Sequence, residues 1–138
     1  MIRLTTILPP RQPDSWGLGH YGAPRGNRKH RGIDFAAFPG STLLTPLTGT
    51  VTKLGYAYSD DPQWRYVEVT NGLGERHRFF YVEPAVGMGQ EVYVGKALGT
   101  VQDVTERYED ITPHVHYEII NADGEYINPE EFWNGGAA

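Results

Sequence analysis

Short runs that alternate hydrophobic and polar residues follow one another along the chain from residue 33 onward. Residues 66–70 alternate aromatic or branched side chains with polar ones, the period of a half-buried β-strand. Further β-type runs occupy residues 41–44, 48–54, 76–82, 90–94, 97–101 and 114–120. The pattern favours a mainly β fold, a curved antiparallel sheet or open barrel, and long helices do not fit it.

Turn-forming residues separate these runs. Residues 71–74, Asn-Gly-Leu-Gly, are typical of a hairpin, and Asp123-Gly124 is typical of another turn. Residues 128–133 predict one short helix, because Asn128 can cap its start, proline suits its first position and acids fill its first turn. The sequence therefore predicts many short strands joined by tight turns.

The length of 138 residues, of which 39% are hydrophobic, predicts one domain with a single core. Residues 1–14 contain three prolines and are expected to form an extended lead-in segment, followed by the folded domain at 15–138. No linker or internal repeat divides the domain. A monomer is the default expectation.

Charge and composition exclude several classes of function. The net charge of −5 provides no global field for nucleic acid or anionic lipid, so neither partner is expected. The absence of cysteine excludes disulfides, zinc-thiolate sites and cysteine nucleophiles. The apolar patch at Ile7-Leu8 is too short for a signal-peptide core or a membrane span, so no ordinary export signal is expected. The basic residues at 25, 28, 29 and 31 form either a solvated loop or an electropositive rim for a carboxylate-bearing substrate.

Histidine and aspartate, both good zinc ligands, occur four residues apart at His30 and Asp34. An extended chain would hold these two residues about 13 Å apart, whereas two ligands of one zinc ion lie about 3–4 Å apart. The backbone must therefore bend between them, and Gly32 permits a bend.

A second group of zinc-type ligands lies at His114-Val115-His116. Strand alternation places both imidazoles on one face and Val115 on the other. One ring can then bind a metal while the other reaches the water on that metal. The spacing does not decide which ring does which. Each motif alone is more often structural than catalytic.

The two motifs, together with three others between them and after them, resemble the lysostaphin-type zinc metallopeptidases, which cleave peptidoglycan peptides. The matching segments, in chain order, are residues 30–37 (HRGIDFAA), 45–51 (TPLTGTV), 89–99 (GQEVYVGKALG), 112–118 (TPHVHYE) and 128–129 (NP). The resemblance implies that one Zn²⁺ is bound by His30, Asp34 and His116. It also implies that His114 is the general base and that a substrate groove follows the concave face of the sheet.

The chain departs from the family pattern at Tyr81. The family has a histidine there that is thought to stabilise the transition state, and a tyrosine hydroxyl is also a hydrogen-bond donor that could do so. Otherwise Tyr81 is an aromatic residue of the groove wall. His77 shares the face of Tyr81 by alternation and is expected in the groove wall or at the surface. His20 and Tyr21 are further candidate groove residues.

A second departure is the acidic stretch at 103–110, which is either a solvated loop or one wall of the groove. A neutral groove with the aromatics Trp64, Phe79 and Tyr81 would suit small Gly/Ala-rich peptides.

The favoured function is that of a zinc endopeptidase that degrades peptidoglycan stem or cross-link peptides. One alternative is a non-catalytic module of the same fold that binds the wall or activates another enzyme. Another is a structural zinc site with His114 as fourth ligand. The absence of an export signal suggests delivery by a bacteriophage, as a lysis enzyme or a tail component.

Overall fold

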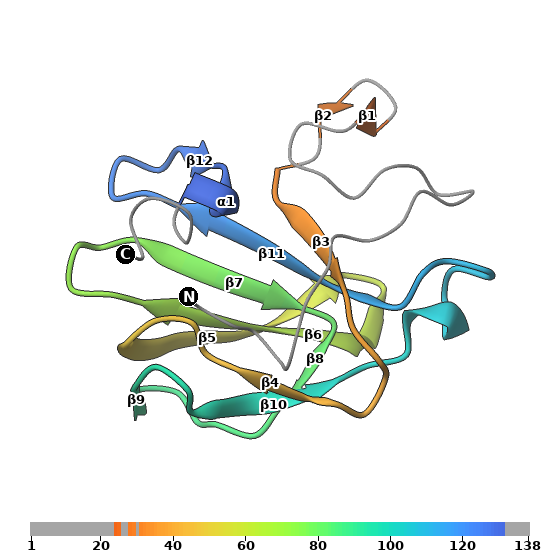
Figure 1. The fold of residues 1–138 in the computed structure, drawn as a ribbon, viewed down its shortest axis with the longest axis horizontal. Coiled ribbons are helices and arrows are strands. Elements are labelled where there is room, and N and C mark those ends of the chain that lie inside the picture. Colours follow the sequence, from red (N-terminus) through yellow and green to blue (C-terminus); the bar gives the residue numbers. More distant parts are fainter. Residues whose placement is uncertain (1–23, 26–27, 30, 132–138) are drawn as a thin grey trace.

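The computed structural model describes residues 24–25, 28–29 and 31–131, and it describes side chains for residues 31–130. The predicted fold class is confirmed, because these residues form a curled antiparallel sheet that makes a half-barrel (Figure 1). The helical segments are the 3₁₀ turn η1 (Val104–Glu106) and the single turn α1 (Pro129–Glu131).

Twelve strands are present in the described residues. Their bounds are β1 (Pro24–Arg25), β2 (Arg28–Lys29), β3 (Ile33–Ala36), β4 (Thr42–Leu44), β5 (Gly49–Tyr58), β6 (Asp61–Thr70), β7 (Arg76–Phe80), β8 (Val82–Pro84), β9 (Glu91–Val92), β10 (Ala97–Val101), β11 (His114–Ile120) and β12 (Tyr126–Ile127). The strands at 97–101 and 114–120 have the predicted bounds, whereas β5 and β6 extend further than predicted into a second hairpin.

The large sheet has the order β12-β11-β7-β6-β5-β9, and β3 pairs with β11 on the side opposite β7. A smaller sheet, β4-β10-β8, packs beside it (Figure 1). β11 therefore lies between an early strand, β3, and a middle strand, β7. This position brings segments from distant parts of the chain to the same face.

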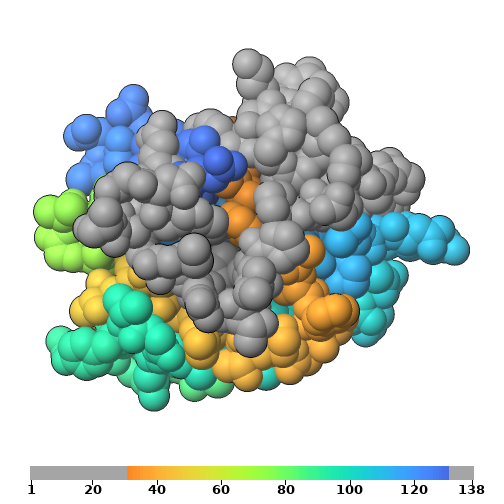
Figure 2. All heavy atoms as spheres, in the orientation of Figure 1, coloured from red at the N-terminus to blue at the C-terminus, as the bar shows by residue number. Residues whose placement is uncertain are grey.

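The core follows the alternation of the strands. Val67 and Val69 of β6, Phe79 of β7 and Val115 and Tyr117 of β11 are fully buried in one cluster. A second cluster, Trp64 with Val104 and Ile111, packs the loop between β10 and β11 against β6. This loop, light blue in Figure 2, projects at one side of the molecule. Its 103–110 segment is therefore anchored to the sheet.

The strand predicted at 76–82 is interrupted at Tyr81. This residue has φ 71°, in the left-handed region that bulky side chains rarely adopt. Its N–H donates to the carbonyl of Arg65 at 2.8 Å, and its carbonyl accepts from the N–H of Gln102 at 2.9 Å. Tyr81 is thus the residue at which the chain leaves the large sheet at β7 and enters the smaller sheet at β8.

Within the described residues, no helix is long and apolar enough to cross a membrane.

Candidate active site

A pocket of about 290 Å³ opens where β3, β11 and β7 meet the loop before β11. Its lining residues combine ionisable and aromatic side chains: Asp34, Ala57, Tyr58, Phe80, Tyr81, Tyr108, Ile111, His114, His116 and Glu118. Four of the predicted site residues, Asp34, Tyr81, His114 and His116, are therefore brought together here. The acidic stretch at 103–110 contributes Tyr108 to the pocket lining. Of its two predicted roles, a solvated loop or a wall of the groove, it therefore has the second.

The sheet register sets the spacing of the ionisable residues. Asp34 of β3 lies directly opposite His116 of β11, and Ala36 lies opposite His114. Side chains directly opposite in an antiparallel pair have Cβ atoms about 5 Å apart. The Asp34 Oδ1 is accordingly 2.9 Å from the Nδ1 of His116, and its Oδ2 is 3.7 Å from the Nε2 of His114. The carboxylate therefore faces both imidazoles.

His116 is held between two carboxylates. Its Nδ1 faces Asp34, and its Nε2 lies 2.9 Å from Glu118 Oε1. Glu118 lies two residues after His116, on the same face of β11. Burial lowers the pKa of His116, but the hydrogen bonds to Asp34 and Glu118 outweigh burial and raise it to about 9. The two acids therefore favour the protonated form of the ring.

Glu118 connects His116 to a row of polar residues across the sheet. Arg78 Nη1 lies 3.7 Å from Glu118 Oε2, and Arg78 Nε donates to Glu68 at 2.6 Å. Glu68 also accepts from the hydroxyl of Thr52 at 2.8 Å. The carboxylates of Glu68 and Glu118 are nearly buried, so the charge of Arg78 compensates for their loss of water. The row fixes the position of Glu118.

His114 is oriented by its own backbone. Its Nδ1 lies 2.7 Å from the carbonyl oxygen of Thr112. Because a carbonyl only accepts, Nδ1 must carry the proton, and the neutral ring then has its lone pair on Nε2. Nε2 is the nitrogen that faces Asp34. The ring of Tyr81 packs edge-on against His114, with centroids 5.4 Å apart. This is the tautomer and orientation that a general base in the pocket requires.

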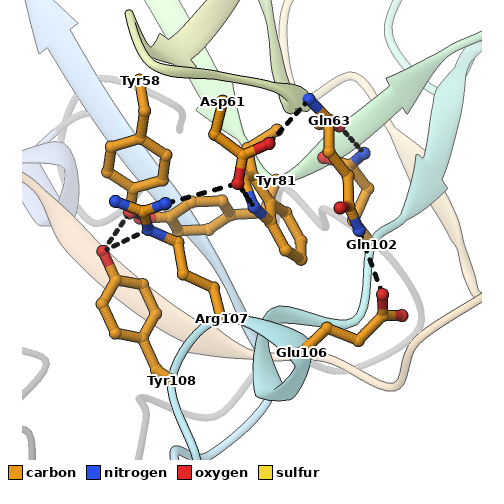
Figure 3. A network of polar contacts seen from close by, with 9 residues as sticks. Tyr58, Asp61, Gln63, Tyr81, Gln102, Glu106, Arg107 and Tyr108 are labelled. Carbon is orange, nitrogen blue, oxygen red and sulfur yellow. Dashed lines mark hydrogen bonds and ion pairs between the residues drawn. The ribbon is translucent and has the colours of Figure 1, made fainter.

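Three tyrosines, Tyr58, Tyr81 and Tyr108, line the pocket together with His114. Figure 3 shows the three tyrosines and the polar contacts around them. The hydroxyl of Tyr58 lies 2.7 Å from that of Tyr81 and is also hydrogen-bonded to that of Tyr108. Burial raises the pKa of Tyr81 and that of Tyr58 well above their ordinary range. Both hydroxyls therefore keep their protons at neutral pH and can donate hydrogen bonds.

Gly32 is needed for a close approach between strands, and not for the left-handed bend that a glycine permits. A Cβ atom at this position would lie 2.3 Å from the backbone oxygen of Tyr117 and 3.0 Å from Cε1 of His116. No other residue would let the start of β3 lie so close to β11.

His77 is not in the groove wall or at the surface, and that expectation is corrected. The side chain has no exposed surface, and its Nδ1 lies 2.6 Å from the hydroxyl of Tyr117. His77 shares its face with Phe79, which points into the core, whereas the positive φ of Tyr81 reverses the alternation after Phe80. Trp64 and Phe79, expected as groove aromatics, are also buried and outside the pocket lining.

The predicted residues His30, His20 and Tyr21 lie outside the described residues. Within the part of the chain that the structure describes, no group of three or more His, Cys, Asp or Glu side chains is arranged to hold a metal ion. The Asp34–His116 pair nevertheless fits two ligands of a zinc site. An oxygen and a nitrogen donor on one tetrahedral zinc lie about 3–4 Å apart, and the 2.9 Å between Asp34 Oδ1 and His116 Nδ1 is just below this range. Glu118 on the second ring nitrogen is the outer-shell partner that metal-binding histidines usually have.

The sequence reasoning missed Glu118, Tyr58 and Tyr108 as site residues. Glu118 has a local signal, because it lies two residues after His116 and strand alternation places both on one face. Tyr58 and Tyr108 have none, since 50 residues separate them and only the packing of the 103–110 loop against β5 brings them together.

A family comparison matches residues 28–129 to the model of peptidase family M23. Among curated proteins, the mouse (Mus musculus) leukocyte cell-derived chemotaxin-2 is 32% identical over 105 residues, which cover 76% of this chain and 69% of that protein. An uncharacterized metalloprotease of Haemophilus influenzae is 29% identical over 103 residues, covering 74% of this chain and 20% of that protein.

The fold is also that of solved structures. The catalytic domain of lysostaphin, an antimicrobial peptidase from Staphylococcus simulans, aligns with a TM-score of 0.69 and 19% identity over 86% of this chain and 91% of the domain. The chain covers only 50% of the whole lysostaphin chain solved by NMR. A zinc-containing peptidase from Vibrio cholerae aligns with a TM-score of 0.56 and 19% identity, covering 91% of this chain and 35% of that one. At these identities the structural likeness establishes the fold alone.

Proposed function

Because the chain belongs to peptidase family M23, we propose that it is a zinc-dependent endopeptidase that hydrolyses peptide bonds in bacterial peptidoglycan. The observation that carries the proposal is the joint orientation of Asp34, His116 and His114 toward one pocket. A purely structural core has no need of two histidines and a carboxylate at the wall of an open pocket.

Asp34 and His116, together with His30 as the third ligand, would hold the zinc ion. When bound, zinc acidifies a water molecule and polarises a carbonyl group, which is the chemistry that peptide hydrolysis needs. To serve as a ligand, His116 would lose the proton on its Nδ1, which faces Asp34, while its Nε2 would remain hydrogen-bonded to Glu118.

His114 is the proposed general base. The hydrogen bond of Nδ1–H to Thr112 directs the Nε2 lone pair toward the Asp34 side of the pocket, where a water molecule would lose its proton. The same nitrogen can then return the proton to the leaving amine. Tyr81 is the proposed donor to the oxyanion of the tetrahedral intermediate, in place of the family histidine. The proton on its hydroxyl and its contact with His114 support this role.

Three observations support peptidoglycan as the substrate. Lysostaphin, whose catalytic domain has the same fold, is described as an antimicrobial peptidase. Beside its ionisable residues, the pocket is lined by four uncharged aromatic side chains, which suit small Gly/Ala-rich peptides: Tyr58, Phe80, Tyr81 and Tyr108. The net charge of −5 makes nucleic acid an unsuitable partner.

The proposal includes delivery by a bacteriophage, as a lysis enzyme or tail component. Finding the protein in purified phage particles would support the tail version, and finding it only in uninfected bacterial envelopes would contradict both.

The test is digestion of purified peptidoglycan by zinc-loaded wild type and by His114→Ala, with the fragments identified by mass spectrometry. Wild type is expected to produce new peptide termini, and His114→Ala is expected to be slower by about 10²–10⁴-fold. Identical fragment maps at equal rates would exclude His114 as the base.

A second candidate function is a non-catalytic module of this fold that binds the wall or activates another enzyme. The tyrosine at position 81 favours it, since the family motif has a histidine there, and the similar mouse and cattle proteins are named chemotaxins. The digestion experiment separates the two functions. Binding to peptidoglycan without any new termini, by protein with a full complement of zinc, would favour the module.

A further inference from the structure

Three phenols and one guanidinium form a continuous hydrogen-bonded chain that leads from the protein surface to the pocket. Arg107 Nε donates to the hydroxyl of Tyr108 at 3.3 Å, Tyr108 is hydrogen-bonded to Tyr58, and Tyr58 lies 2.7 Å from Tyr81 (Figure 3). The four side chains come from β5, from the residue between β7 and β8, and from the loop after η1.

A cation at the outer end gives this chain a direction. A guanidinium only donates, so Tyr108 must accept from it. Arg107 also stacks on Tyr58, with its central carbon 3.7 Å from the ring centroid. Its positive charge favours hydroxyl oxygens that face it and O–H bonds that point away from it. Of the two possible donor orders between these hydroxyls, the charge favours the one in which Tyr108 donates to Tyr58 and Tyr58 donates to Tyr81. In this order the proton of Tyr81, which lines the pocket, is available to a bound molecule.

We infer that Tyr58, Tyr108 and Arg107 are positioning residues that orient the Tyr81 hydroxyl as a hydrogen-bond donor toward the reacting carbonyl oxygen of a bound peptide. The inference rests on the proposed peptidase function and concerns the part of the site in which this chain departs from the family motif. It accounts for a tyrosine where the motif has histidine, because the phenol is supplied with partners that fix its proton.

The surrounding contacts keep the hydrogen-bonded chain of side chains rigid. Asp61 pairs with Arg107 Nη1 at 3.3 Å and accepts from Trp64 Nε1 at 2.9 Å, and the indole packs edge-on against Tyr81. Gln63 donates to Glu106 at 3.0 Å, which ties the loop to β6. The backbone of Tyr81 is fixed on both sides by Arg65 and Gln102. A donor held in place before the reaction stabilises an oxyanion better than one that must reorganise.

The role of the hydrogen-bonded chain can be tested by enzyme kinetics. Tyr81→Phe should lower kcat by about 10²–10³-fold, the usual effect of removing one oxyanion donor. Tyr58→Phe keeps the ring and its packing, and should lower kcat by about tenfold, the effect of one hydrogen bond, with KM nearly unchanged. Because Tyr58 acts only through Tyr81, the double variant should be no slower than Tyr81→Phe alone.

The experiment measures kcat and KM of the zinc-loaded full chain on a soluble peptidoglycan peptide, with zinc content and melting temperature measured for every variant. Tyr56→Phe is the matched control, because this tyrosine lies on the same strand, is exposed and stacks on Arg65 away from the pocket. It should match wild type. Arg107→Met removes the charge of a partly exposed side chain and keeps its aliphatic part. It should lower kcat two- to fivefold in wild type and not at all in Tyr81→Phe.

An active wild type with an unchanged Tyr58→Phe, or losses that multiply in the double variant, would overturn the inference and leave the proposed function standing. A wild type that holds zinc and cuts no peptidoglycan peptide would overturn the proposed function. It would also overturn the catalytic role of the hydrogen-bonded side chains.

Discussion

Asp34 and His116 face each other across β3 and β11, with a carboxylate oxygen 2.9 Å from a ring nitrogen, although 82 positions separate them in the sequence. The pairing is a consequence of sheet register, because residues 33–36 lie opposite residues 117–114 in the antiparallel pair of strands. Shifting this register by one residue would turn His116 to the other face. The site therefore depends on the close contact between these two strands.

Gly32→Ala should damage that contact. The added methyl would lie 2.3 Å from the backbone oxygen of Tyr117, so β3 must move away from β11. We expect the free energy of unfolding in urea to fall by about 1–3 kcal/mol, the usual cost of overpacking, and zinc affinity to fall as well. Gly72→Ala is the control, because nothing lies within 4 Å of the added atom, and it should change stability little. Equal stability and zinc affinity in wild type and Gly32→Ala would contradict the close-approach role.

Glu118→Gln should weaken zinc binding without abolishing it. The amide keeps the size of the side chain but loses the charge that fixes and polarises the His116 ring. Removing an outer-shell partner of this kind typically costs about 10–100-fold in metal affinity. Competition with a chromophoric chelator measures the affinity. Glu83→Gln, an exposed glutamate on β8, is the matched control, and an equal affinity for both variants would exclude Glu118 from this role.

His77 should make the protein sensitive to acid. Burial lowers its pKa from 6.5 to about 3, so between these values the unfolded chain binds a proton that the folded chain does not. The free energy of unfolding therefore has its full value above pH 6.5 and falls as the pH is lowered. The contribution of this group to the fall is up to about 1.4 kcal/mol per pH unit. His77→Gln should remove this component, and urea unfolding from pH 7.5 to 4 measures it. Parallel stability curves for the two proteins would show that His77 does not contribute.

The sequence predicted the strands well because alternation is local. The buried face of a strand can be identified within a few residues, as at Val67 and Val69 or at Val115 and Tyr117. It also predicted that His114 and His116 share a face, and the family resemblance paired Asp34 with His116. The resemblance assigned Tyr81 to the site even though alternation at this residue fails.

What the sequence could not provide was the effect of tertiary contacts on single residues. The positive φ of Tyr81 reverses the alternation, so extending the pattern across it placed His77 on the wrong face. The contact of Tyr58 with Tyr108 depends on how a loop packs against β5, and no local pattern encodes it.

The central claim is that one divalent ion is shared by Asp34 and His116, and calorimetric titration of zinc into chelator-stripped protein tests it most directly. We predict one binding site per chain in wild type, and loss of that site in Asp34→Ala and in His116→Ala, with both variants still folded by circular dichroism. Tight binding of one zinc ion by the double variant Asp34→Ala/His116→Ala, equal to that of wild type, would contradict the account.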